Sequence, residues 1–358
     1  MRTVNGGTAS GWEIRRDAQL SDNAMEQHAR ALAVNMRVDG TAQLRICGLS
    51  REISKMRQLA GRLMSQQEPT MAMEWLLDNA RMVEARPAAV GREKSERLPA
   101  HGGVPRLLTL MHELVVHSDA RISEERLLRA VRAFDEVQGL KMHELWKIPT
   151  ALSLELCAAF LSVSRRVVRA AGQRRDADEW VQAILSGKAP DMKSMPREEA
   201  FFERALHLLH EQEMPEVRAQ LERWLGDRDM DAESLIHAEH ERQAVDRLWL
   251  SNIMQAFRML DALDWGEAFQ KLSRTENELM RDPAGIYGNL DDESKEVLRK
   301  RLCLLAHRAD VGEVTVARHV LKLSREGQGL KRHVGWWHSE EQGQRALLTD
   351  MGARADGH

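Results

Sequence analysis

Two histidines and two glutamates lie within five residues, in the stretch HAEHE from His237 to Glu241. His237 and His240 are three residues apart and share one face if the segment is helical. Imidazole and carboxylate groups at this spacing can bind a divalent metal or transfer protons. The stretch does not follow the HExxH pattern of zinc hydrolases, however, and no PCxxC follows it as in zinc deaminases. We therefore favour the polar start of a helix, and a metal-dependent enzyme using His237 and His240 is the less favoured alternative.

The segment MHELVVHSD holds a second histidine pair, His112 and His117. Five residues correspond to about 140° around a helix, so the two rings cannot face one metal from a regular helix. Ser118 or Asp119 is then expected to cap the next helix, because hydroxyl and carboxylate oxygens accept the free N–H groups there.

A basic cluster occurs at Arg165, Arg166, Arg169, Arg174 and Arg175. We expect it at the C-terminus of a helix, where cations stabilise the helix dipole. The chain has 52 Lys plus Arg against 55 Asp plus Glu, a net charge of −3, and no aromatic residues interleave the cluster. This balance argues against nucleic acid as a partner.

The elements that must position these side chains are predicted to be helices. Helix-forming residues dominate the composition, and runs of β-branched residues are missing. We predict an all-α protein, an irregular array of about twelve helices in two packed helical subdomains. A long helix is expected from about residue 232 to 263, capped by Asp231, because apolar side chains recur at steps of three and four, namely Val245, Trp249, Ile253, Ala256, Leu260 and Leu263.

The predicted domain boundaries follow from composition and from proline and glycine positions. These boundaries divide the chain into four segments: a disordered tail over 1–24, a helical subdomain over 25–212, a second helical subdomain with the long helix over 213–337, and an irregular tail over 338–358. The segment RPAAVGREKSERLPAHGGVP is interpreted as a linker, and Pro149 is expected to kink or restart a helix.

Nothing in the chain predicts a membrane span or a disulfide framework. The most apolar window, ALSLELCAAFLSVS, is interrupted by Glu155 and is shorter than the ~20 residues that a bilayer requires. The three cysteines lie far apart and form no CxxC pair. We expect a soluble cytoplasmic chain with no cofactor.

Seven motifs appear in a fixed order along most of the chain. They are EWLLDN (Glu74–Asn79), ELVVHSDARISEERLLRAVRAFDEV (113–137), ELWKIPTAL (Glu144–Leu152), AEHERQA (Ala238–Ala244), LDALDW (Leu260–Trp265), DPAGIY (Asp282–Tyr287) and RHVGWW (Arg332–Trp337). Together they resemble the N-terminal region of cyclic β-1,2-glucan synthases, which are large bacterial membrane enzymes. The resemblance covers about residues 25–337.

The resemblance implies a helical cytosolic region that precedes membrane spans and a glycosyltransferase module using UDP-glucose. The catalytic motifs of that family lie in modules that this sequence does not include. No catalytic, cofactor-binding or metal-binding residue can therefore be carried over to this chain. We expect a non-catalytic module that scaffolds or regulates the synthase, or else a stand-alone helical adaptor.

The end of the resemblance combines basic and aromatic residues, Lys331 and Arg332 beside Trp336 and Trp337. Such residues are typical of a membrane interface. In the family a membrane span follows shortly afterwards, but here the chain continues as HSEEQGQRALLTDMGARADGH. We expect a truncated gene product or a separate subunit that contacts the remainder of a synthase, another protein, or the inner membrane through Trp336 and Trp337. The alternative is that both rings pack against the helices.

Overall fold

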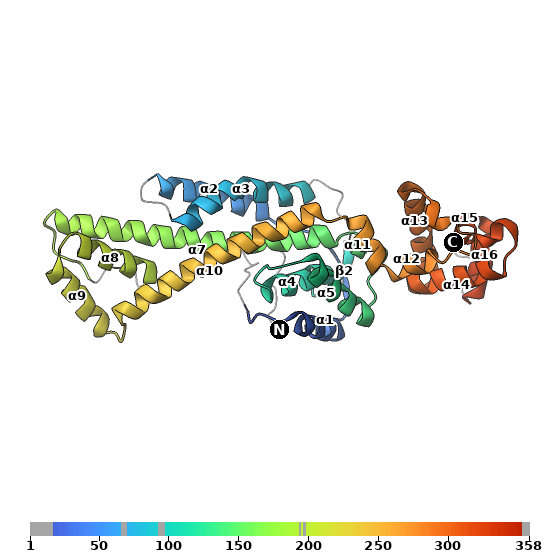
Figure 1. The fold of residues 1–358 in the computed structure, drawn as a ribbon, viewed down its shortest axis with the longest axis horizontal. Helices are drawn as coiled ribbons and strands as arrows, with labels where there is room; N and C mark the ends of the chain where they lie inside the picture. Colours follow the sequence, from blue (N-terminus) through green and yellow to red (C-terminus); the bar gives the residue numbers. More distant parts are fainter. Residues whose placement is uncertain (1–16, 66–69, 92–96, 193–194, 196–197, 353–358) are drawn as a thin grey trace. The chain divides into compact units, whose positions relative to one another are not determined.

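The computed structural model describes residues 17–65, 70–91, 97–192, 195 and 198–352. Within these ranges it contains sixteen α-helices, two short 3₁₀ helices and one small sheet (Figure 1), so the prediction of an all-α protein is confirmed. Most of the predicted tail, residues 1–16, lies outside the described residues. The rest of it is partly helical, because α1 begins at Asp22.

The chain folds into two compact units that are interleaved along the sequence. Unit 1 takes in residues 17–21, Arg37–Ser123 and Thr150–Asp261, and unit 2 takes in Asp22–Met36, Glu124–Pro149 and residues from Ala262 onward. These units differ from the predicted division at residues 212 and 213. Helical periodicity reveals which face of a helix is buried, but it carries no information on which distant helix covers that face.

Unit 1 is built on two long helices, α7 and α10. Its elements are β1 (Gly40–Gln43), α2 (Leu49–Met64), α3 (Met71–Val90), β2 (Arg97–His101), β3 (Val104–Pro105), α4 (Arg106–Val116), α7 (Ile148–Leu185), α8 (Glu199–Glu211), α9 (Pro215–Gly226) and α10 (Ala232–Ala262). In Figure 1, α8 and α9 lie between the C-terminal end of α7 and the N-terminal end of α10. A cluster of Phe, Trp, Met and Leu side chains fills the space that these four helices enclose.

The long helix α10 forms where the sequence predicts it. Asp231 accepts a hydrogen bond from Ser234 N at 2.8 Å, and Trp249, Ile253 and Ala256 of the predicted apolar stripe are buried. The hydroxyl and the backbone N–H of Ser234 together lower the pKa of Asp231 below its ordinary value. This carboxylate therefore remains charged at the positive end of the helix dipole, as a cap should.

The helix α7 is longer than predicted. It starts at Ile148, so Pro149 falls in its first turn, where its missing N–H costs nothing, and the predicted restart is confirmed. It then runs without a break through the arginine cluster to Leu185. The predicted C-terminal position of Arg165 to Arg175 is therefore wrong, and these arginines lie in the middle of a helix.

A small antiparallel sheet replaces part of the predicted linker. β1 pairs with β2 and β2 with β3, with Gly40 opposite Ala100 and Ala100 opposite Pro105. The strands have two to five residues, too few for a two-residue alternation to stand out in the sequence. The sheet is consequently an element that the sequence does not predict.

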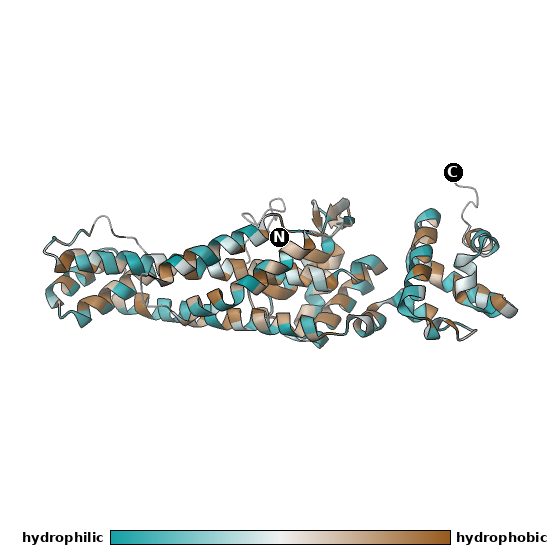
Figure 2. Ribbon diagram, turned by 90° about the horizontal axis from the view of Figure 1, so that it is seen from above, coloured by the Kyte–Doolittle hydropathy of each residue, from teal (hydrophilic) through white to brown (hydrophobic). Residues whose placement is uncertain are grey.

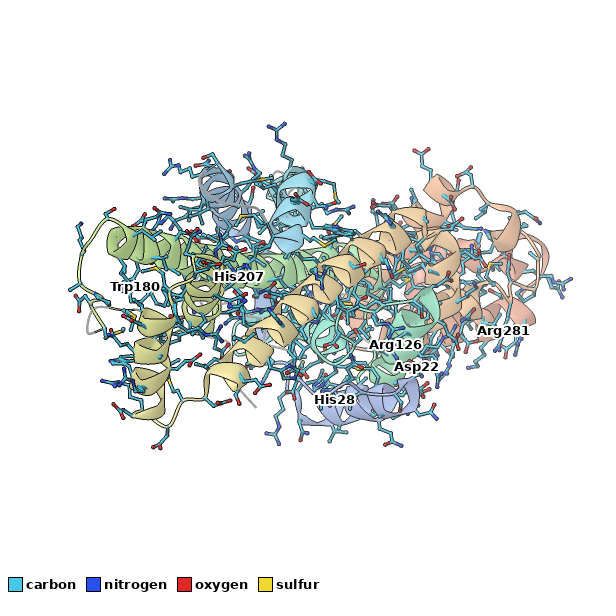
Figure 3. The ribbon with its side chains drawn as sticks, turned by 60° about the vertical axis from the view of Figure 1, so that its left-hand side comes forward. Asp22, His28, Arg126, Trp180, His207 and Arg281 are labelled. Carbon is cyan, nitrogen blue, oxygen red and sulfur yellow. The ribbon has the colours of Figure 1, made fainter. Side chains whose placement is uncertain are left out.

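Unit 2 gathers shorter helices from three parts of the chain. They are α1 (Asp22–Asn35), α5 (Glu124–Val137), α6 (Met142–Leu145), α11 (Trp265–Leu272), α12 (Arg274–Leu279), η1 (Tyr287–Asn289), α13 (Asp292–Ala309), α14 (Glu313–Glu326), η2 (Gly329–Arg332), α15 (Val334–Ser339) and α16 (Glu341–Asp350). Asp22 and Arg126, which Figure 3 shows side by side, join α1 to α5 through an ion pair of 2.5 Å.

The predicted irregular tail over 338–358 contains α16, although residues 353–358 lie outside the described residues. Leu347 and Leu348 of α16 are buried. A Cβ atom at Gly343 would lie 2.8 Å from the carbonyl oxygen of Trp336, so only glycine permits this close approach of α16 to α15. Tertiary packing therefore stabilises a helix that the polar local sequence does not indicate.

Candidate functional site

The two histidines of the HAEHE stretch are exposed and bind different carboxylates. His237 and His240 are 74% and 60% exposed, and each pairs with a different carboxylate, Glu241 at 3.2 Å and Glu203 at 3.6 Å. Among the described residues neither ring belongs to a group of three ligand atoms close enough to hold one ion. Their side chains lie on the solvated face of α10, which supports the polar helix start.

The acid between these histidines faces the interior of unit 1. Glu239 is fully buried and accepts a hydrogen bond from Arg174 Nη2 of α7 at 2.5 Å and another from Gln243 at 3.0 Å. Arg242 also pairs with it. Another member of the basic cluster acts in the same way, because Arg166 binds Asp246 at 2.6 Å. The arginines of α7 thus attach α10 to α7.

We expect the double substitution His237→Ala and His240→Ala to leave the free energy of unfolding within about 0.5 kcal/mol of the parent, since both rings are exposed. Urea denaturation measures this value, and elemental analysis of the purified proteins should give the same metal content for both. A matched Glu239→Ala variant should be far less stable, because it leaves Arg174 without its buried partner. Loss of bound metal from the histidine variant would contradict the structural role.

A second polar centre of unit 1 lies beneath α10. Trp249 donates its indole N–H to Asp119 Oδ1 at 3.1 Å, and Asn252 donates to the carbonyl oxygen of Asp119 at 2.9 Å. Asp119 is fully buried and has a positive φ of 49°, which is unusual for a residue other than glycine. The prediction that Ser118 or Asp119 caps the following helix is wrong, because α5 begins only at Glu124. Ser118 donates to the carbonyl oxygen of Leu114, and Asp119 binds the buried side of α10.

The apolar window that Glu155 interrupts is part of the core of unit 1. Glu155 is fully buried and accepts a hydrogen bond from His112 Nδ1 at 3.0 Å. Burial acts to lower the pKa of His112, but the hydrogen bond and the charge of Glu155 outweigh it and raise the pKa above its ordinary value. This pair joins α4 to α7 inside the unit. His117 has different partners, with its Nδ1 at 2.9 Å from the carbonyl oxygen of Ala18, so the two rings serve separate contacts as their spacing predicts.

In unit 2 the DPAGIY loop and the RHVGWW segment meet at one carboxylate. Asp282 accepts hydrogen bonds from the backbone N–H groups of Ile286, Tyr287 and Val334 at 2.9–3.0 Å, and from His333 Nδ1 at 2.7 Å. Burial would raise the pKa of Asp282, but these hydrogen bonds outweigh it and hold the pKa below its ordinary value. The anionic side chain closes the loop and connects it to α15.

A buried ion pair lies next to this loop. Arg299 of α13 donates to both oxygens of Glu276 in α12, at 2.8 and 2.7 Å, and Tyr287 donates its hydroxyl to the same carboxylate at 3.0 Å. Glu276 is fully buried, and Arg299 is 8% exposed. Burial, reinforced by the charge of Glu276, raises the pKa of Tyr287.

Aromatic rings cover the same guanidinium group. The carbon atom at the centre of the Arg299 guanidinium lies 5.1 Å from the centroid of Phe269 and 6.0 Å from that of Trp146, and these two rings stack at 4.4 Å. Trp146 belongs to ELWKIPTAL, and Phe269 lies in α11, which Asp264 of LDALDW caps. Unit 2 therefore brings together four motifs that are distant in the sequence.

The Trp pair packs against the helices, which is one of the two alternatives that the sequence left open. Trp337 is 8% exposed and donates its indole N–H to the carbonyl oxygen of Lys331 at 2.8 Å. Trp336 is partly buried, stands edge-on to Trp337 with centroids 5.0 Å apart, and lies 5.1 Å from Lys331 Nζ. The rings thus support the turn that carries Lys331.

The neighbouring His338 is a candidate residue that the sequence does not single out. Its side chain is fully buried, and both ring nitrogens are without a hydrogen-bond partner among the described residues. Burial, together with the positive charges of His333 and Arg301, lowers its pKa to about 3. The local sequence WWHS contains no signal that this polar ring faces inward.

One open cavity of about 370 Å³ lies beside the sheet in unit 1. Its lining includes Arg97, Cys47 and Leu108. The guanidinium group of Arg97 is already bound to the hydroxyl and carbonyl oxygens of Thr41, at 2.8 and 2.6 Å. The buried ion pairs described above, such as Arg174–Glu239 and Arg299–Glu276, lie elsewhere and attach helices to each other.

The fold and these centres define a helical protein whose motif residues hold distant segments together. No family model matches the chain. The chain is similar to the cyclic beta-(1,2)-glucan synthase NdvB of Rhizobium meliloti (strain 1021), with 27% identity over 277 residues. The match covers 72% of this chain and 10% of that protein, so the chain spans about a tenth of the relative's length. This similarity supports the relationship to the cyclic β-1,2-glucan synthase family that the ordered motifs indicate.

The helices do not meet the requirements of a bilayer span. None of the described helices is both long enough and apolar enough to cross a membrane. Figure 2 shows why for the two longest, α7 and α10, which carry hydrophilic residues along their length between the hydrophobic ones.

Proposed function

We propose that this chain is a non-catalytic helical module of a cyclic β-1,2-glucan synthase system. It scaffolds or regulates a membrane glycosyltransferase that uses UDP-glucose. The observation that carries the proposal is the similarity to NdvB over 277 residues. The chain spans only a tenth of that protein, so its connection with the activity of the complete enzyme is proposed and not observed.

The use of the motif residues supports a scaffolding role. Asp282 of the DPAGIY loop binds the backbone of Val334 in the RHVGWW segment, and the neighbouring Glu276 binds Arg299. The sole tyrosine, Tyr287, is fully buried and bound to Glu276. Buried contacts of this kind make the unit rigid, and a module that positions an enzyme requires a rigid structure.

The partners in this proposal are the remainder of a membrane glucan synthase and the inner membrane, which the chain meets from the cytoplasm as a peripheral protein. No cofactor and no nucleic acid takes part. Two of the arginines that could have bound phosphate are engaged with buried carboxylates inside unit 1, in the pairs Arg166–Asp246 and Arg174–Glu239.

Complementation in trans tests the proposal. NdvB from which the aligned segment has been deleted should make little cyclic glucan alone, and co-expression of this chain should restore the product measured in cell extracts. The chain should also copurify with the deleted enzyme from detergent-solubilised membranes. Absence of both restoration and copurification would exclude the module role.

A stand-alone adaptor is the second candidate, and one surface of unit 1 favours it. Met71 and Trp75 of α3 and Leu248 of α10 are 58%, 38% and 49% exposed, and Arg247 Nη1 lies 3.4 Å from Met71 Sδ. Exposed apolar side chains gathered on two adjacent helices are typical of a protein-binding face. If Trp75→Ala abolishes capture of a partner unrelated to glucan synthesis, the adaptor role is favoured.

A further inference from the structure

The most exposed large apolar side chain among the described residues is Leu330, at 77%. It lies in η2 (Gly329–Arg332) with the exposed cations Lys331 and Arg332 directly after it. A leucine in such a position leaves its apolar surface in water and gains nothing from the folded core. The position is therefore suited to an occupant from outside the chain.

The turn that exposes Leu330 is held in place by contacts on both sides. Trp337 donates to the carbonyl oxygen of Lys331, and Arg332 Nη2 lies 3.3 Å from the carbonyl oxygen of Pro283. Gly329 has a φ of 57°, and a Cβ atom at Gly327 would lie only 2.5 Å from the carbonyl oxygen of Lys331. The backbone conformation of the turn therefore fixes Leu330 in its exposed position.

The loop that contains Pro283 also exposes an apolar side chain. Ile286, in the loop closed by Asp282, is 42% exposed. Asp282 itself is buried and bound to His333, so its negative charge is not offered to solvent. The exposed groups of the two turns are therefore apolar or cationic.

We propose that the η2 turn, with Leu330 at its tip and Lys331 and Arg332 beside it, docks on the surface of an anionic lipid bilayer. A narrow tip with one aliphatic side chain and two cations suits a bilayer, where the leucine enters the acyl region and the cations bind headgroup phosphates. Lysine is depleted at the centre of protein–protein interfaces, which argues against a protein partner here. The lipid contact thus involves the turn, while Trp337 supports it from behind.

This inference deepens the proposed function, since it names the lipid class and the residues of the peripheral contact. Its test does not need a synthase. Sedimentation of the purified full chain with vesicles of phosphatidylcholine and phosphatidylglycerol should show binding that weakens as salt rises. Vesicles of phosphatidylcholine alone should bind far less.

Two variants locate the contact. Leu330→Ser should lower the partition coefficient roughly ten-fold through the lost apolar transfer. The double substitution Lys331→Gln and Arg332→Gln should lower it roughly thirty-fold, at about a factor of five per charge. Leu248→Ser and Lys55→Gln are the matched controls, because they remove an exposed leucine and an exposed cation from unit 1.

Equal binding by the parent and both turn variants, or no binding to anionic vesicles at low salt, would overturn the lipid proposal. A second result would also reject the lipid proposal. In it, the parent chain does not bind vesicles, and Leu330→Ser prevents copurification with the deleted NdvB in detergent. That result would assign the turn to a protein partner and leave the proposed function standing. Vesicle binding without any complementation would instead retain the lipid site and reject the module role.

Discussion

Replacing Arg299 with Met is expected to lower the free energy of unfolding of unit 2 by about 3–5 kcal/mol. The reason is the fully buried Glu276, which would lose two hydrogen bonds of 2.7 and 2.8 Å and the positive charge that balances it. Urea denaturation followed by circular dichroism measures the change, and hydrogen exchange of α12 and α13 assigns it to unit 2.

The adjacent Lys300 provides the control. Its ion pair with Glu296 is exposed on both sides, so Lys300→Met should change stability by no more than about 0.5 kcal/mol. Adding Glu276→Met to Arg299→Met should recover much of the loss, because replacing both ions by apolar groups removes the unpaired charge. If Arg299→Met and Lys300→Met have similar small effects, the buried pair does not hold unit 2 together.

Lowering the pH from about 6.5 to about 5 is expected to remove about 2 kcal/mol of stability through His338 alone. Burial lowers the pKa of this histidine from 6.5 to about 3 in the folded chain, so the unfolded chain binds the proton first. The stability that the neutral His338 ring contributes is fully present above the unfolded pKa of 6.5. It decreases as the pH falls below 6.5 and stops decreasing near pH 3. Each pH unit within this window corresponds to about 1.4 kcal/mol.

The substitution His338→Leu isolates this effect, since leucine keeps the side chain apolar and cannot titrate. The variant should match or exceed the parent in stability at neutral pH, because the buried ring nitrogens have no partner to lose among the described residues. At about pH 5 it should be the more stable protein, by the same ~2 kcal/mol. His237→Gln, at a histidine 74% exposed, serves as the control for replacing a histidine. Parallel pH curves for the parent and His338→Leu would contradict the prediction.

Local sequence signals predicted much of the fold. Asp231 caps α10 as predicted, and Thr70 caps α3 in the same way by accepting a hydrogen bond from Met73 N at 3.4 Å. These interactions span three residues, so the local sequence contains both partners. The predicted C-terminal position of the arginine cluster was wrong for the opposite reason. Helices α8 and α10 pack against α7 from far along the chain, and their burial of its surface outweighs the low helix propensity of Gly172.

The buried polar centres were less predictable than the helices. Histidine pairs at helical spacing resemble metal sites, so the sequence pointed to His237 and His240. The structurally important residue is Glu239, which lies between them and is buried. Glu276 and Arg299 are separated by 23 positions, and nothing in their neighbourhoods indicates that each buries the other's charge. Burial depends on tertiary contacts, so a charged side chain facing the core looks the same in sequence as one facing solvent.

The interleaving of the two units has a consequence for how the chain is synthesised. Helices α1 and α5, which both belong to unit 2, leave the ribosome before α7 and α10 of unit 1. They cannot complete the packing of unit 2 until α11 to α16 have been synthesised. Unit 1 can close as soon as residue 261 has emerged, although its own first segments have by then been interrupted twice. Folding order therefore differs from sequence order, and unit 2 is the part whose unfinished helices must avoid incorrect contacts for the longest time.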